Sequence, residues 1–184
     1  MMEYVFIGMG AFTLLYVVSV YNGLVTLRNN VSKAWSDIDV LLKQRYDELP
    51  KLVAVCERYL THEHETLVRV IQARNMASNS SSPERRTTAE NEITDALKSL
   101  FAVVESYPNL KADQSFQGLQ GRVSTLENTV ADRREFYNAS VNLYNIGIEK
   151  MPDAIIAGWL KLSRKQLWQI EPAHREDVKL QFTR

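Results

Sequence analysis

The stretch REFYNASVNLYN holds the side chains best suited to chemistry in this 184-residue chain. It begins at Arg134 and places one tyrosine–asparagine pair at Tyr137 and Asn138 and another, one heptad later, at Tyr144 and Asn145. Residues seven apart share a helix face, so a catalytic constellation, a ligand ladder and a polar packing network are all conceivable. Catalysis would need a nucleophile with a base within reach, and no histidine or carboxylate is spaced to serve it. We interpret the repeat as a buried hydrogen-bonded layer that fixes the register between helices, with a partner-binding face as the main alternative.

The segment THEHE, residues 61–65, raises the question of a metal site. A zincin-type site needs two histidines four residues apart, whereas His62 and His64 are two apart and diverge by about 200° around a helix. The chain also contains no glycine-rich phosphate loop. The sequence therefore predicts no metal, no cofactor and no catalytic residue.

Other reactive side chains lie in or beside apolar stripes. Cys56 falls between Leu52 and Tyr59 in one such stripe, which favours a buried apolar role over a catalytic thiol. Asp37 and Asp39 diverge on a helix, so we interpret them as partners for cations on adjacent helices or as a surface read by another protein.

Two arginines, Arg45 and Arg133, occupy stripe positions where apolar residues are expected. A buried unpaired charge costs several kcal/mol, so each arginine should reach solvent or meet a carboxylate. The available acids include Asp37, Asp39, Asp47 and Glu127.

The N-terminal segment from Tyr4 to Leu27 contains no charged residue. At about 1.5 Å per residue it is long enough to cross about 30 Å of hydrocarbon. The preceding Met-Met-Glu lacks the cations of a signal peptide, and no Ala-x-Ala-like cleavage site follows, so we expect a retained transmembrane anchor over residues 1–28. Lysine and arginine occur only downstream of the span, which places the N-terminus outside and the body, residues 29–184, in the cytoplasm.

Composition favours an all-α body, because glycine and proline are scarce and helix formers are plentiful. Apolar stripes with steps of three and four predict three long antiparallel helices, with Pro50 inside the first and turns near 78–82 and 108–112. The third helix, about 113–150, exceeds the second, about 83–107, so we expect residues 151–182 to cover its apolar stripe. Ile155, Ile156, Trp159, Trp168 and Ile170 should provide that cover, and VKLQF near the end suits an extended tail.

Several blocks in order, among them YPNLKADQSFQGLQ, LENTVADRREFYNASVNLYN and MPDAIIAG, resemble the LemA family. The resemblance runs from Tyr21 to Gly158. It implies a bacterial inner-membrane protein with an N-terminal anchor, an elongated helical bundle and no established enzymatic activity.

Together these features predict a non-enzymatic scaffold or adaptor that is held in the lipid bilayer and presents a cytoplasmic bundle to other proteins. Self-association that organises the membrane is the first alternative, and a ligand sensor is the second. Lysine plus arginine equal aspartate plus glutamate at 22 each, so bulk charge gives no case for nucleic-acid binding.

Overall fold

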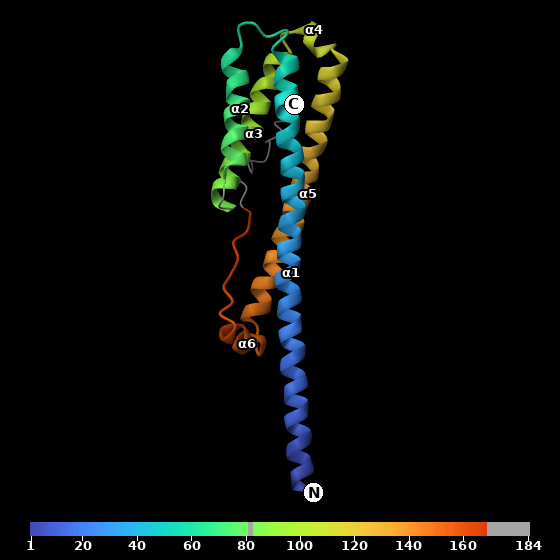
Figure 1. The fold of residues 1–184 in the computed structure, drawn as a ribbon, viewed down its shortest axis with the longest axis vertical. Coiled ribbons are helices and arrows are strands. Elements are labelled where there is room, and N and C mark those ends of the chain that lie inside the picture. The colour runs from blue at the N-terminus through green and yellow to red at the C-terminus, as the bar shows by residue number, and fades with distance from the viewer. Residues whose placement is uncertain (81–82, 169–184) are drawn as a thin grey trace, which may run out of the picture. The chain divides into compact units, whose positions relative to one another are not determined.

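A computed structural model describes residues 1–80 and 83–168, and the regular structure in these ranges is entirely helical. The predicted all-α class, with a long apolar N-terminal helix packing on long helices, is therefore confirmed. Figure 1 labels the helices in chain order: α1 Met2–Cys56, α2 His64–Ser78, α3 Pro83–Val104, α4 Pro108–Lys111, α5 Gln114–Glu149 and α6 Asp153–Trp159.

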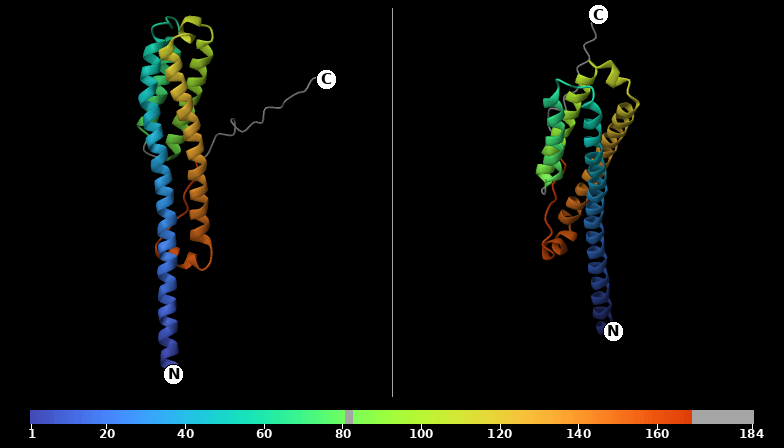
Figure 2. Two further views of the ribbon diagram at one scale, coloured as in Figure 1. Left: turned by 90° about the vertical axis from the view of Figure 1, so that its right-hand side faces the viewer. Right: turned by 45° about the horizontal axis from the view of Figure 1, so that its top comes forward.

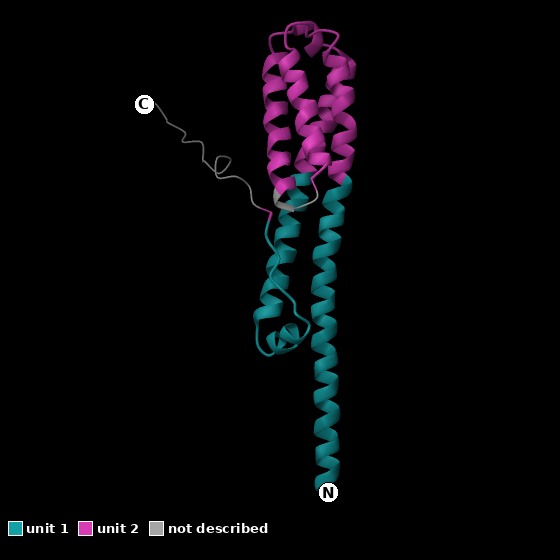
Figure 3. Ribbon diagram, turned by 60° about the vertical axis from the view of Figure 1, so that its left-hand side comes forward, with its two compact units in different colours: residues 1–40, 130–167 teal, residues 41–129, 168–184 magenta. Residues whose placement is uncertain are grey.

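The chain divides into two compact units (Figure 3). Unit 1 contains residues 1–40 and 130–167, and unit 2 contains residues 41–129 together with Trp168. α1 and α5 each contribute one part to each unit, and α1 continues past residue 28 without a break.

Unit 2 is a four-helix arrangement in which successive helices reverse direction (Figure 1). Its core is formed by apolar residues spaced three and four apart, as predicted for α1, α3 and α5. Members of this core with almost no exposed surface are Leu42, Leu49, Leu52, Cys56, Ile93, Leu100, Phe116 and Val123. Pro50 lies inside α1 without ending it.

The first body helix is shorter than predicted, because residues 57–63 form a turn between α1 and α2. Contacts with distant residues hold this turn. The Tyr59 hydroxyl donates to Asp113 at 2.9 Å, and the Tyr107 hydroxyl donates to Glu63 at 3.4 Å. The turn contains neither glycine nor proline, so the local signals that mark most helix ends are missing.

The predicted turn near 108–112 is occupied by the single-turn helix α4, which has Pro108 at its first position. Asp113 then caps α5, since its Oδ1 accepts hydrogen bonds from the backbone N–H of Ser115 at 2.7 Å and Phe116 at 3.0 Å. At the other predicted turn α2 ends at Ser78 and α3 begins at Pro83, and residues 81–82 lie outside the described ranges.

Unit 1 pairs residues 24–40 of α1 with the C-terminal part of α5, and the first turns of α1 extend past α5 (Figure 2). At Gly147 on α5 the two helices approach closely, because a Cβ there would lie 2.5 Å from Cδ1 of Leu27. After α6 the chain turns and an extended segment, residues 162–167, runs back along α5; we call this segment the strap.

The C-terminal cover differs in detail from the prediction. Ile155 and Trp159 are exposed, and the buried residue of α6 is Ala157. The strap covers α5. Trp168, which was also predicted to belong to the cover, is buried. Ile170 and the VKLQF tail lie outside the described residues.

Candidate functional site

The tyrosine–asparagine repeat on α5 binds the backbone of the strap. The Tyr144 hydroxyl donates to the carbonyl of Ser163 at 3.2 Å, and the Tyr137 hydroxyl donates to the carbonyl of Gln166 at 3.3 Å. Asn145 makes two bonds of 2.9 Å, donating from Nδ2 to the Lys165 carbonyl and accepting the Lys165 N–H at Oδ1. The layer thus joins a helix to an extended segment, which corrects the expected register between helices.

The residues predicted to form this layer differ in burial. Tyr137, Tyr144 and Asn145 are buried, whereas Asn138 and Arg134 are half-buried. The ring of Trp35 on α1 packs against Tyr137 with 5.4 Å between centroids. Burial raises the pKa of the Tyr137 hydroxyl, so the group stays a hydrogen-bond donor to a higher pH than an exposed tyrosine would.

A second polar cluster lies inside unit 2. Arg45 is 1% exposed and Glu90 0% exposed, and their charges meet at 2.9 Å between Nη1 and Oε2. Nη2 of Arg45 also reaches Glu127 and the Thr94 hydroxyl, and the Tyr46 hydroxyl donates to Glu90. Burial, together with the Glu90 charge, raises the pKa of Tyr46 far above its usual range.

The sequence predicted a carboxylate partner for Arg45 and included Glu127, but missed Glu90. The signal was present, because Glu90 precedes Ile93 by three residues and Leu97 by seven and so lies in the α3 apolar stripe. Neither Asp37, which is half-buried, nor Asp39, which is exposed, belongs to this cluster. Arg133 reaches solvent, which is the other outcome expected for a stripe arginine.

The Arg45 cluster is closed to solvent at Arg45 and Glu90, so a substrate has no access to its central ion pair. Cys56 is also buried, and burial raises the pKa of its thiol to about 12, which makes it a poor nucleophile. Within residues 1–80 and 83–168, no three histidine, cysteine, aspartate or glutamate side chains gather as metal ligands would.

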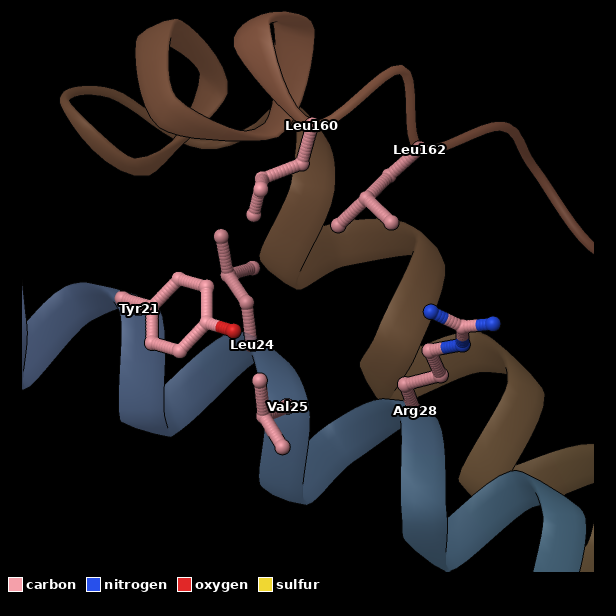
Figure 4. A pocket seen from close by; sticks show the side chains of 6 residues that line it. All are labelled: Tyr21, Leu24, Val25, Arg28, Leu160 and Leu162. Carbon is pink, nitrogen blue, oxygen red and sulfur yellow. The ribbon is translucent and has the colours of Figure 1, made fainter.

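Two adjoining pockets lie in unit 1, where the end of α6 and the start of the strap face α1. One, about 260 Å³ in volume, is lined by Arg28, Tyr144, Leu160, Lys161, Leu162, Ser163 and Lys165. The other, about 90 Å³, is lined by Tyr21, Leu24, Val25, Arg28, Leu160 and Leu162 (Figure 4). Sequence reasoning missed this site, since no motif joins residues 21–28 to residues 160–165.

Comparison with known proteins gives one family match. The profile of the LemA family matches residues 34–182, a range that begins after Tyr21 and extends past Gly158.

Individual relatives cover this chain to different extents. Magnetosome protein MamQ 2 of Paramagnetospirillum magneticum is 34% identical over 85 residues, which cover 46% of this chain and 31% of that protein. Magnetosome protein MamQ of Magnetospirillum gryphiswaldense is 21% identical over 179 residues, covering 83% of this chain and 66% of that protein. Protein LemA of Metamycoplasma hominis is 27% identical over 161 residues, covering 85% and 72%. The chain therefore spans less than a third of the Paramagnetospirillum protein that it matches.

Proposed function

The chain belongs to the LemA family, and from that premise we propose that it is a membrane-anchored, non-enzymatic helical adaptor that presents a cytoplasmic body to partner proteins. The observation that carries this proposal is α1, a single helix of 55 residues whose two ends have opposite character. Its first part is apolar and exposed, whereas its last part supplies buried residues to unit 2.

The exposed part of α1 has the properties of a membrane span. An 18-residue window of this helix has a mean hydropathy of 1.8, and 0% of that window is buried. The core helix of a soluble protein would bury such a surface, so the exposure supports a bilayer as its surroundings. The cations that follow the span, beginning with Arg28, support placing the body in the cytoplasm.

An exposed apolar stripe on α5 supports the binding of a partner. Phe136, Leu143 and Ile146 are 53%, 59% and 52% exposed. Their spacing of seven and three residues puts them on one helix face, the pattern with which amphipathic helices pair. The stripe is distinct from the face of α5 that holds the strap, so a partner could occupy it without disturbing the Tyr144 and Asn145 bonds.

Self-association that organises the membrane is the second candidate, because the same spacing suits pairing between two copies of α5. Photo-crosslinking in native membranes separates the two. A photoreactive residue at Leu143 should capture a different protein, while one at Met76, which is 56% exposed on α2, serves as the matched control. Crosslinks between copies of this chain would favour the second candidate, and equal capture at both positions would refute a specific face.

Anchoring needs its own test. We expect the full chain to remain in the membrane through carbonate extraction, and a C-terminal reporter to be active only in the cytoplasm. Release of the intact chain by carbonate would refute the anchor, and a reporter active outside the membrane would refute the orientation.

A further inference from the structure

The larger unit 1 pocket concentrates positive charge. Its lining includes Arg28, Lys161 and Lys165 and no acidic residue. Over the ranges described, none of these three cations forms an ion pair with a carboxylate. Two neighbouring cations are neutralised: Lys150 pairs with Asp153 at 3.1 Å and Arg164 with Glu149 at 3.1 Å. The pocket thus presents unneutralised charge that an anion would complement.

Lys161 holds its position in the pocket at a cost in backbone conformation. It has a φ of 51° and follows Leu160, the C-cap residue of α6. The Leu162 N–H bonds to the Ala157 carbonyl at 3.0 Å and the Lys161 N–H bonds to the Gly158 carbonyl at 3.1 Å, the pattern of a Schellman cap. Glycine suits this left-handed position best. A lysine there is consistent with a use for its ammonium group, since strained residues cluster at functional sites.

The smaller pocket is lined by four aliphatic side chains together with Arg28 and Tyr21, and it adjoins the charged one. Figure 4 shows Leu160 and Leu162 pointing toward α1, with Arg28 rising from α1 beside Leu162. Arg28, Leu160 and Leu162 line both pockets, so the two pockets adjoin. A ligand that fills both would carry an anionic group next to a hydrocarbon chain.

The site lies where the proposed span ends. Tyr21, Leu24 and Val25 belong to the last turns of the apolar segment, and Arg28 is the first cation after it. Trp159 of α6, 80% exposed, is the residue type that favours the interface between headgroups and hydrocarbon. In a bilayer the cations would therefore be at the depth of lipid phosphates.

We propose that this pair of pockets binds one anionic phospholipid, with the phosphate held by Arg28, Lys161 and Lys165 and an acyl chain lying against Val25, Leu160 and Leu162. The proposal rests on the anchoring of α1 described above. The ligand is assigned as a lipid because a free phosphate would leave the smaller pocket and its aliphatic side chains unused.

The test uses the full chain in phosphatidylcholine nanodiscs that contain a minority of phosphatidylglycerol. After release into a neutral detergent, native mass spectrometry counts the lipids that stay bound. We expect one retained phosphatidylglycerol, and Arg28→Gln and Lys161→Gln should each weaken its retention about fivefold, the effect of one cation near an anionic headgroup. Lys33→Gln removes the same charge from an exposed α1 residue about 7.5 Å farther along the helix and should change little.

Lys161→Gly separates binding from folding. It relieves the left-handed backbone, so it should melt no earlier than the wild type and yet retain less phosphatidylglycerol. Equal retention of phosphatidylcholine, or equal loss in Lys33→Gln, would overturn the site. Displacement of the lipid by inorganic phosphate would indicate a free-anion site and overturn the lipid assignment. A chain that resists carbonate but retains no phosphatidylglycerol would refute this inference alone, whereas release by carbonate would refute the anchoring.

Discussion

Replacing Asn145 by alanine should detach the strap from α5. The side chain is 7% exposed and bonds both backbone groups of Lys165, each at 2.9 Å. Alanine removes both partners, so the Lys165 N–H and carbonyl must find water or remain unsatisfied. The tyrosine bonds to Ser163 and Gln166 would then hold the strap alone.

The magnitude follows from the number of bonds lost. An intramolecular hydrogen bond contributes about 0.5–1.5 kcal/mol net, so the loss of two should cost about 1–3 kcal/mol in the opening equilibrium of the strap. That cost corresponds to an increase of about 5- to 150-fold in the population of the open strap. Tyr144→Phe removes one bond of 3.2 Å and should have a smaller effect.

Hydrogen–deuterium exchange on the full chain in detergent measures this opening directly, through the amides of residues 162–167. Exchange should accelerate in Asn145→Ala by the factor above while amides near Leu49 in unit 2 keep their protection. Asn142→Ala is the matched control, because Asn142 is an exposed asparagine on the same helix. Unchanged exchange in Asn145→Ala would show that these bonds do not hold the strap.

Three further changes probe other parts of the chain. Arg45→Leu leaves the buried Glu90 carboxylate without its cation, so it should lower the free energy of unfolding by about 3–5 kcal/mol, as measured with denaturant. A decrease below about 1 kcal/mol, the usual contribution of an exposed ion pair, would contradict the burial of that cluster. Cys56 should react slowly with iodoacetamide in the native protein at about pH 8, because burial raises its pKa from 9.0 to about 12. Rapid alkylation of the native protein would show that the site is open. The raised pKa also means that the protonated thiol contributes fully to stability below about pH 9, and that this contribution is lost as pH rises toward 12. Lys161→Gly should raise the free energy of unfolding by about 0.5–1 kcal/mol, since relief of the left-handed backbone outweighs the greater freedom of glycine in the unfolded chain. A lower melting temperature than that of the wild type would argue against strain at this position.

The helices of the body could be predicted because their signals are local. Apolar residues three and four apart in α1, α3 and α5 are the residues that the structure buries, and Pro83 begins α3 as its type suggests. Arg45 was recognisable as an exception within its stripe, and its position demanded a carboxylate. Glu90 falls within the apolar period of α3 in the same way, so its position demanded a cation.

The C-terminal cover of α5 was predicted, but the turn at 57–63 and the path of the strap could not be, for a different reason. Asp113 and Tyr107 hold the turn from far along the chain, so no window around Leu60 contains the cause. In the strap, residues 163–166 contribute backbone groups to α5, and backbone groups are common to every sequence. The tyrosine–asparagine repeat indicated that a polar layer exists, but the residue types of the strap gave no indication that the strap is its partner.

That use of backbone groups has a consequence for how each side of the layer tolerates substitution. Tyr137, Tyr144 and Asn145 recognise carbonyl and N–H groups, which any residue except proline presents alike. The information that specifies the layer is therefore held almost entirely by the helix. In a saturation scan, the three α5 positions should accept very few residues, while Ser163 and Gln166 should accept nearly all. Proline at position 165 should be the exception, because proline alone lacks the backbone N–H that donates a hydrogen bond to Asn145.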